Sequence, residues 1–339
     1  MFLGSARKSV LILVGLVVMS LWLGACGNNE ANITPAATSA AKPAEETVSP
    51  SASASASSEA AVEKTLTDGV GNEVKIPANP QRIIAAYLED HLIALGIKPV
   101  AQWSVANGVQ DYLIEGLNGV PNIPYDLPFE AVTSFEPDLI IMGSGANVEG
   151  DKYKQYSQIA PTYTIGDQIN NDWRQALLKI GEVLNKSEEA QKVLNDYEVK
   201  AAAAKEKLTN AVGTQSAAAV WLVQKNFFIV SEKLSSGAVL YKDLGMAIPK
   251  IVEEISKTSE SNWNPISLEQ LALLDADHLF LINSDVSTGS ESLKDPVWQG
   301  IPAVKNGNLY EYSNTTSWLY TGTIANSQII DDVLESVVK

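Results

Sequence analysis

The stretch SEEAQKVLNDYEVKAAAAKEKL, from Ser187 to Leu208, decides the fold class of this chain. It is rich in Ala, Glu, Lys and Leu, which are strong helix formers, and its apolar residues recur at helical spacing. Ser187, followed by Glu188 and Glu189, predicts an N-cap that separates this helix from a shorter one beginning near Asp172. A helix of this length spans on the order of 30 Å, enough to cross between two domains. The stretch therefore predicts two domains joined by one long helix.

Short apolar strands alternate with helical patterns on both sides of this helix. Strands are predicted at 83–87, 100–103, 139–142 and 162–165 before it, and at 217–223, 227–230, 279–282 and 309–312 after it. A hairpin is predicted over residues 65–76, and a last helix over residues 324–338. Such alternation is typical of the α/β class, with a parallel sheet covered on both faces.

The two halves share a short pattern at a constant offset. Glu130 and Glu269 lie 139 positions apart (269 − 130), and each stands at the start of a short helical segment that leads into an apolar strand. The segments run over residues 129–141 and 268–281. This repeat agrees with a layout of two similar lobes.

The composition excludes several functions. Of the 339 residues, 40 are acidic and 24 basic, which gives a formal charge of −16 and disfavours a nucleic-acid partner. The single Cys cannot form an internal disulfide, and two His are too few for most zinc or manganese sites. No Gly-x-Ser-x-Gly, His-Glu-x-x-His or P-loop motif is present.

Residues 1–25 have the pattern of an export signal. Arg7 and Lys8 precede an uncharged run of 16 residues from Val10 to Ala25, which is shorter than a membrane-spanning helix. The sequence Leu23-Gly24-Ala25-Cys26 resembles the lipobox of bacterial lipoproteins. The resemblance implies cleavage before Cys26 and acylation of this residue, so that the protein is held at the outer face of the cell membrane by a lipid anchor.

A linker is predicted after the anchor, over residues 26–62. From residue 27 to residue 62, 24 of 36 residues are Ala, Ser, Thr or Pro, and none is aromatic. Such a composition cannot bury enough apolar surface to offset the entropy of ordering, so the segment is expected to be flexible. The remainder is divided into an N-terminal α/β lobe (63–171), connecting helices (172–211) and a C-terminal α/β lobe (212–339).

Five stretches, taken in order, resemble the siderophore-binding proteins of ABC importers. They are DGVGNEVKIPANPQRII (68–84), LEDHLIALGIKPV (88–100), residues 129–142, GAVLYKDLG (237–245) and residues 267–282. The resemblance covers nearly all of the chain from Thr65 onward. It implies the class III fold of periplasmic binding proteins, in which two Rossmann-like lobes are joined by one long helix.

The resemblance also implies a non-catalytic function. A monomer with no cofactor and no metal site of its own would bind a ferric siderophore between the lobes, with iron present only in the chelate. It would deliver this ligand to membrane permease subunits, which work with a cytoplasmic ATPase. Glu130 and Glu269, one from each lobe, would dock on the permease.

Candidate ligand-binding residues follow from the rule that open α/β sheets bind ligands beyond the carboxyl ends of their strands. Trp263 joins them because it lies in a polar loop, whereas Trp173 and Trp298 are expected to be structural. The candidates are Tyr87, Trp103, Ser144, Trp221, Phe228, Trp263, Trp318 and Tyr320.

The predicted site favours a particular class of chelate. The resembling pattern often has Arg where this chain has Trp221 and Phe228, and this departure removes positive charge from an acidic domain. A trianionic catecholate complex would lose charge-assisted hydrogen bonds there. We therefore expect a neutral or cationic ferric hydroxamate, which suits an aromatic site.

Three alternatives remain open from the sequence. A cobalamin- or haem-binding protein of the same family would also suit an aromatic site. An extracytoplasmic hydrolase is less favoured, because His91 falls in a helical pattern and His278 adjoins a buried strand, so both are expected to be structural. A lipoprotein that binds a free metal ion is disfavoured by the His count.

Overall fold

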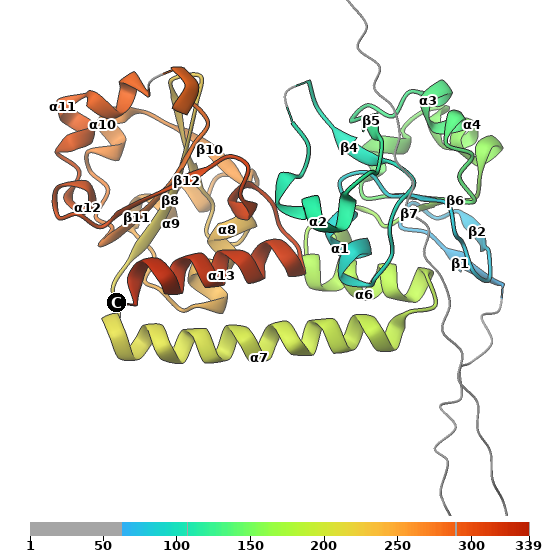
Figure 1. The fold of residues 1–339 in the computed structure, drawn as a ribbon, viewed down its shortest axis with the longest axis horizontal. Helices are drawn as coiled ribbons and strands as arrows, with labels where there is room; N and C mark the ends of the chain where they lie inside the picture. The colour runs from blue at the N-terminus through green and yellow to red at the C-terminus, as the bar shows by residue number, and fades with distance from the viewer. Residues whose placement is uncertain (1–62, 107, 289, 339) are drawn as a thin grey trace, which may run out of the picture. The chain divides into compact units, whose positions relative to one another are not determined.

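The computed structural model describes residues 63–106, 108–288 and 290–338 (Figure 1). These residues belong to one compact unit. The predicted signal peptide, the predicted lipidation site Cys26 and the predicted linker 26–62 lie outside the described residues. Within the described ranges, no helix has both the length and the apolar character needed to span a bilayer.

The N-terminal lobe begins with the predicted hairpin. Strands β1 (Lys64–Thr67) and β2 (Glu73–Ile76) pair antiparallel. The Asp68 carboxylate accepts hydrogen bonds from the backbone N–H groups of Val70 (3.1 Å) and Asn72 (2.7 Å), and Gly71 adopts a φ of 91° that favours glycine. The turn residues seen in the sequence therefore form the turn.

A parallel sheet forms the centre of this lobe, in the order β3-β6-β7. Its strands are β3 (Ile83–Ile84), β6 (Leu139–Met142) and β7 (Thr162–Thr164), and a second parallel pair consists of β4 (Gln102–Ser104) and β5 (Asn122–Pro124). The helices are α1 (Glu89–Ala94), η1 (Asp111–Leu113), α2 (Ile114–Leu117), α3 (Phe129–Ser134), η2 (Gly145–Val148), α4 (Lys152–Ile159) and α5 (Asp167–Asn170).

Both faces of the β3-β6-β7 sheet are buried, as the apolar strands predicted. Leu139 and Ile141 join one apolar core, whereas Ile140 and Met142 join another. Alternate residues of a strand point to opposite faces, so β6 contributes to both cores. The first of these cores continues through the connecting helices into the C-terminal lobe.

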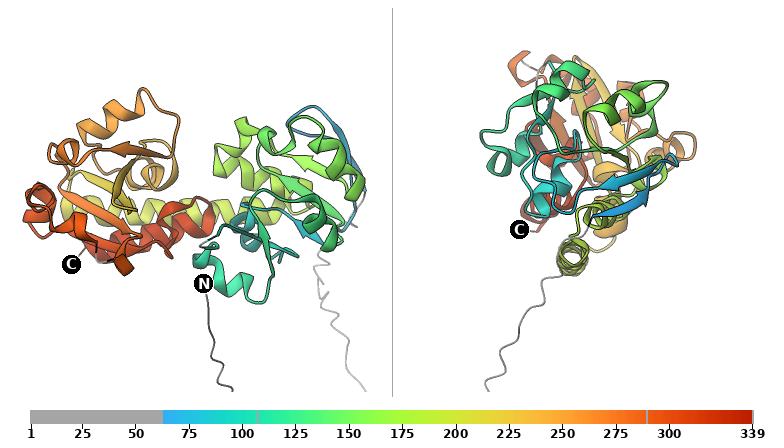
Figure 2. Two further views of the ribbon diagram at one scale, coloured as in Figure 1. Left: turned by 90° about the horizontal axis from the view of Figure 1, so that it is seen from above. Right: turned by 90° about the vertical axis from the view of Figure 1, so that its right-hand side faces the viewer.

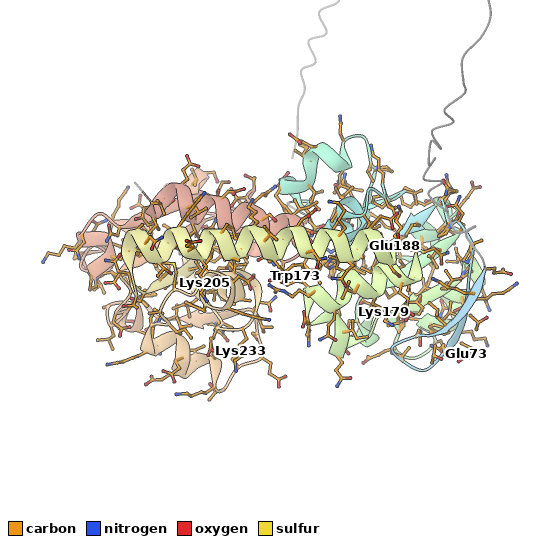
Figure 3. The ribbon with its side chains drawn as sticks, turned by 90° about the horizontal axis from the view of Figure 1, so that it is seen from below. Glu73, Trp173, Lys179, Glu188, Lys205 and Lys233 are labelled. Atoms are coloured by element: carbon orange, nitrogen blue, oxygen red, sulfur yellow. The ribbon has the colours of Figure 1, made fainter. Side chains whose placement is uncertain are left out.

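The connecting segment consists of α6 (Trp173–Val183) and α7 (Ser187–Val212). Helix α7 has 26 residues and is therefore about 39 Å long. It packs against α6 and against the last helix of the chain, and the end-on view in Figure 2 shows it outside the sheets. Figure 3 shows α7 running from the region of Glu188 to that of Lys205. The predicted N-cap was wrong by one residue: Lys186 is the N-cap, without a side-chain hydrogen bond, and Ser187 is already helical.

A five-stranded sheet in the order β10-β9-β8-β11-β12 forms the C-terminal lobe. Its strands are β8 (Ala217–Val223), β9 (Asn226–Val230), β10 (Trp263–Ile266), β11 (His278–Asn283) and β12 (Leu309–Ser313). The helices are α8 (Ser235–Ala238), η3 (Val239–Asp243), α9 (Lys250–Ser256), α10 (Leu268–Leu271), η4 (Val286–Thr288), η5 (Glu291–Lys294), α11 (Pro296–Gln299), α12 (Pro302–Lys305), η6 (Ser317–Leu319) and α13 (Thr323–Val337).

This second sheet is mixed rather than parallel, which corrects the sequence-based expectation. Strand β9 is antiparallel to both β8 and β10, whereas β11 is parallel to β8 and β12. The cause is a two-residue turn: Gln224 and Lys225 both have positive φ, as a tight hairpin requires. The Asp285 carboxylate holds this turn by accepting both of their backbone N–H groups at 2.7 Å.

The repeated pattern has a structural basis. Helix α3 leads into β6 and helix α10 leads into β11. Just before β6, the Asp138 carboxylate accepts the backbone N–H groups of Gln81 (2.7 Å) and Arg82 (2.9 Å), next to β3. Asp277, which is 139 positions later, accepts the backbone N–H (2.7 Å) and hydroxyl (2.8 Å) of Ser216, next to β8. Each lobe therefore uses an Asp at the same place to join two neighbouring parallel strands.

Candidate functional site

A cavity of about 390 Å³ opens in the N-terminal lobe at the carboxyl ends of β3 and β6. Rings, apolar side chains and uncharged polar groups line it, and none of the lining side chains in the described part of the chain carries a charge. The lining residues are Ala86, Tyr87, Leu88, Trp103, Tyr125, Leu127, Met142, Gly143, Ser144, Asn147 and Asn170. An aromatic cavity with a few polar groups is the usual form of a small-molecule site.

Two of the predicted rings form one wall of this cavity. Tyr87 follows β3 with a φ of 66°, and Trp103 lies in β4. Their ring centroids are 5.0 Å apart in an edge-to-face arrangement, which is a favourable geometry for aromatic pairs. Tyr87 is half exposed, so its ring is available to a ligand.

The side chain of Glu89 holds the backbone of Trp103, one of the two residues of this wall. Glu89 is fully buried, and its Oε1 accepts the backbone N–H of Trp103 at 2.6 Å, whereas Oε2 has no partner among the described residues. Burial raises the pKa of Glu89 to about 7 and outweighs the hydrogen bonds from backbone N–H groups, which lower it. The side chain therefore ties α1 to β4 and changes its charge near neutral pH.

Ser144 is one of the uncharged polar residues that line the cavity. It follows β6 and is the N-cap of η2, because its hydroxyl accepts the backbone N–H of Ala146 at 3.1 Å. Its own backbone N–H donates to Asn147 Oδ1 at 3.2 Å. The carboxyl ends of β3 and β6 are neighbours in a parallel sheet, which explains why Tyr87 and Ser144 line the same cavity.

Tyr320, which belongs to the C-terminal lobe, places its ring beside the aromatic side chains of the N-terminal lobe. Its ring centroid is 6.2 Å from that of Tyr87 and 5.0 Å from that of Tyr112, and its hydroxyl donates to the carbonyl oxygen of Val109 at 3.3 Å. The two lobes therefore meet at a cluster of aromatic side chains next to the cavity.

A second aromatic cluster lies on the C-terminal sheet. Trp221 and Phe228 are cross-strand partners with ring centroids 5.4 Å apart, and Trp263 lies 6.1 Å from Trp221. All three are half-buried. Trp221 Nε1 donates to the hydroxyl of Ser284 at 2.9 Å, whereas Trp263 Nε1 is buried without a partner in the described part of the chain.

The prediction that Trp318 contacts a ligand is corrected by its burial. Trp318 has no exposed surface, and its ring stacks on Phe280 with centroids 4.8 Å apart. Its Nε1 donates to Asp332 Oδ2 at 2.8 Å, which satisfies the polar end of the ring inside the core. The polar residues around Trp318 in the sequence suggested exposure, but Asp332 of α13 is a distant partner that local sequence does not reveal.

Several cavity residues were missed by the sequence analysis. Tyr125 follows β5, a strand that was overlooked because Pro121 and Pro124 flank its centre. Asn147 could have been found, because Ser144 followed three residues later by Asn147 forms a capping box. The contact of these residues, and of the predicted ones, with a ligand stays a prediction.

The two predicted docking residues occupy matching positions. Glu130 lies in the first turn of α3 and Glu269 in the first turn of α10, and both are exposed. Hydrogen bonds from its own backbone N–H and from Ser267 hold the pKa of Glu269 below its ordinary value. Both side chains therefore face solvent, one in each lobe.

The two histidines have structural surroundings, as expected. His91 is buried in α1, and burial lowers its pKa to about 4. His278 contacts Gln215 Oε1 through Nε2 at 2.8 Å and the hydroxyl of Tyr310 through Nδ1 at 3.1 Å. In the described ranges, no group of three or more His, Cys, Asp or Glu side chains is arranged to hold a metal ion.

A larger cavity, of about 450 Å³, lies in the C-terminal lobe beside the β8–β9 turn. Its lining includes the charged residues Lys225, Glu291, Lys294 and Asp295. Lys294 is paired with Glu291 at 2.8 Å. We consider the cavity in the N-terminal lobe the stronger candidate, because its rings converge and because it adjoins the contact between the lobes.

These features are those of a two-lobed binding protein, and comparison with known proteins agrees. A model of the family described as periplasmic binding protein matches residues 87–316, and the chain belongs to this family. It is similar to the "Probable siderophore-binding lipoprotein YfiY" of Bacillus subtilis strain 168, with 28% identity over 287 residues, covering 80% of this chain and 86% of the relative.

Two further similarities concern proteins of the same organism. The "Iron(3+)-hydroxamate-binding protein FhuD" of Bacillus subtilis is 28% identical over 273 residues, which cover 78% of this chain and 84% of the relative. A solved structure of an FhuD-fold periplasmic binding component of a ferrichrome ABC transporter from Bacillus subtilis superposes with a TM-score of 0.70. It is 26% identical and covers 81% of this chain and all of that chain.

Proposed function

We propose that this protein is the binding component of an ABC importer, which captures a ferric siderophore and delivers it to the membrane permease without catalysing a reaction. Membership of the periplasmic binding protein family supports this proposal. The relatives named above bind siderophores or ferric hydroxamates, according to their names. The cavity in the N-terminal lobe, together with Tyr320 from the other lobe, forms the binding site in this proposal.

The proposal that the ligand is a hydroxamate rests on the absence of charged side chains from the described cavity lining. None of the described residues that line the cavity is charged. A trianionic catecholate would lose hydration there without gaining an ion pair, and the net charge of −16 would repel it. A neutral ferric trihydroxamate such as ferrichrome presents apolar and carbonyl groups, which suit rings and the amides of Asn147 and Asn170.

Quenching of Trp fluorescence by a panel of ferric chelates tests this proposal. We expect the purified full-length protein in detergent to bind ferrichrome and not ferric enterobactin, a trianionic catecholate. Trp103→Ala should weaken ferrichrome binding about tenfold or more, because it removes a ring of the cavity wall. Tyr153→Ala is the matched control, because this half-buried ring of the same lobe does not line the cavity. Binding of enterobactin alone, or of cobalamin or haem alone, would contradict the hydroxamate proposal.

Docking through Glu130 and Glu269 is the second part of the proposal. Both carboxylates are exposed and stand at matching positions in the two lobes. Carboxylates that pair with Arg give strong, directional contacts, so two of them on separate lobes would orient the protein on a permease. The competing explanation is that each Glu merely stabilises the N-terminus of its own helix.

Uptake and binding measured on the same variants separate these explanations. We expect the double variant Glu130→Ala/Glu269→Ala to lose ferrichrome uptake by whole cells and to keep the affinity of the purified protein. The matched control is Glu115→Ala/Glu188→Ala, which removes exposed carboxylates from the first turns of α2 and α7. Normal uptake by the first double variant would refute docking through these residues.

The proposed location is the outer face of the cell membrane, where the protein acts as a monomer held by a lipid on Cys26. The lipobox-like sequence 23–26 supports this location, and a relative is named as a lipoprotein. Cys26→Ser should release the protein into the medium or leave it unprocessed, because the acyl chains would then have no attachment site. Normal processing of that variant together with unchanged membrane association would argue against the lipid anchor.

A further inference from the structure

The last helix of the chain receives its N-terminal cap from the other lobe. Asp90, in the first turn of α1, accepts the backbone N–H of Ile324 through Oδ1 at 3.0 Å and that of Ala325 through Oδ2 at 2.9 Å. These residues belong to the first turn of α13, whose own N-cap residue, Gly322, has no side chain to supply. Such N–H groups need an acceptor, and a carboxylate also suits the positive end of the helix dipole.

The contact is tight on both sides. Asp90 is buried, and a Cβ atom built on Gly322 would lie 2.3 Å from Asp90 Cγ. Only glycine therefore allows the Asp90 carboxylate to approach the start of α13 this closely. The hydroxyl of Tyr112 donates to Asp90 Oδ2 at 3.1 Å, so the carboxylate also holds a side chain of its own lobe.

The residues around this cap lead to the proposed ligand site. Tyr320 precedes Gly322 by two residues, and its ring lies 5.0 Å from the ring of Tyr112 and 6.2 Å from that of Tyr87. Tyr87 lines the cavity with Trp103. The position of α13 relative to α1 therefore sets where the Tyr320 ring stands beside the cavity wall.

We propose that Asp90 is a positioning residue of the ligand site, which acts through α13 to hold the ring of Tyr320 against Tyr87 before a ligand arrives. This inference rests on the proposed function. A ring that is already in place loses no freedom when the ligand binds, whereas a ring on an uncapped, shifted segment must be ordered first. Asp90 contacts the neighbours of Tyr320 and is not a ligand contact itself.

A double-mutant cycle on ferrichrome affinity tests the inference. We expect Asp90→Ala to weaken ferrichrome binding about tenfold, and Tyr320→Ala to weaken it by a similar factor. Because Asp90 acts through Tyr320, Asp90→Ala should then have less than a twofold effect in the Tyr320→Ala background. Effects that multiply in the double variant would overturn the inference, because they would show that Asp90 acts independently of Tyr320.

Two further variants guard against a general loss of structure. Asp138→Ala is the matched control, because it also removes a carboxylate that accepts two backbone N–H groups, but both donors lie in its own lobe; we expect unchanged affinity. Asp90→Asn should weaken binding by less than Asp90→Ala does, because the amide keeps the size of the side chain but has one oxygen and can accept only one of the two backbone N–H groups. Should Asp90→Ala fail to fold, Asp90→Ser takes its place in the cycle, because its shorter side chain cannot reach both N–H groups.

The outcomes separate this inference from the proposed function. A wild-type protein that binds neither ferrichrome nor any other ferric trihydroxamate would overturn both. A wild type that binds ferrichrome, with an Asp90→Ala variant of equal affinity, would overturn only the role of Asp90. Tenfold weakening that disappears in the Tyr320→Ala background would support the inference.

Discussion

At the scale of single residues, helix α1 buries three consecutive ionisable side chains: Glu89, Asp90 and His91. Desolvation acts on all three. It raises the pKa of Glu89 to about 7 and that of Asp90 to about 6, and it lowers the pKa of His91 to about 4. Each shift favours the neutral form of its group, because burial removes the side chain from water.

The titration of Glu89 should be visible in the pH dependence of the free energy of unfolding. Its pKa is higher in the folded protein than the ordinary value of 4.5, so the stability that the neutral carboxyl group contributes is present below about pH 4.5 and is lost as the pH rises through about 7. We therefore expect Glu89→Gln to gain stability relative to the wild type between pH 5 and pH 8, on the order of 2 kcal/mol.

Urea unfolding of both proteins at the two pH values measures this difference. Asp90 and His91 remain in both proteins, so their own titrations largely cancel in the comparison. A constant difference between the two free energies of unfolding across this pH range would show that Glu89 titrates as it does in the unfolded chain.

At the scale of secondary structure, the elements with strong local patterns were predicted well. The helix at 324–338 is observed at Thr323–Val337, and the strand at 139–142 is observed without change. Both carry apolar residues at the spacing of their own structure, so burial of one helix face, or of both strand faces, agrees with the local preference.

The features that were missed depend on distant partners. Strand β10 contains Pro265 and was not predicted, yet it pairs as the edge strand of its sheet, where proline is tolerated. The burial of Trp318 depends on Phe280 and Asp332. The N-cap of α13 comes from Asp90, which is more than 230 positions away in the chain. No pattern around Trp318 or Gly322 contains this information.

Gly322 provides a direct test at this scale. We expect Gly322→Ala to lower the free energy of unfolding by about 1–3 kcal/mol, because its Cβ would collide with Asp90 and displace the cap of α13. Gly307→Ala is the control, because Gly307 also has a positive φ, of 78°, but has open space around its Cβ position. If chemical unfolding showed the same loss of stability for both variants, the effect would come from backbone strain alone and not from the contact with Asp90.

At the scale of the whole folded unit, a second polar contact joins the connecting helices to the C-terminal lobe. Arg174 of α6 pairs with Asp243 of η3 at 2.7 Å and with Glu198 of α7 at 2.6 Å. The hydroxyl of Tyr197 also donates to Asp243, at 2.6 Å, and the Arg174 guanidinium lies over the rings of Trp173 and Tyr197. Desolvation opposes the charge of Arg174, but the bonds to Glu198 and Asp243 together raise its pKa.

Replacing Arg174 should therefore lower the free energy of unfolding by more than the loss of a surface ion pair would. Asp243 is nearly fully buried and would be left with an uncompensated charge, so we expect Arg174→Met to lower the free energy of unfolding by about 3 kcal/mol. The double variant Arg174→Met/Asp243→Asn should recover part of this loss, because no buried charge is then left without a partner. If urea unfolding gave equal stabilities for the single and double variants, the unpaired Asp243 carboxylate would not be what destabilises Arg174→Met.

The bond between residues 90 and 325 also constrains when folding can be completed. Synthesis proceeds from the N-terminus, so α1 is available long before α13 has been made. Contacts of such large sequence separation close late, because the loop entropy must be overcome first. In a nascent chain, the Asp90 carboxylate therefore has no helix to cap until α13 has been synthesised, and the contact between the rings of Tyr87 and Tyr320 cannot be held by this cap before then.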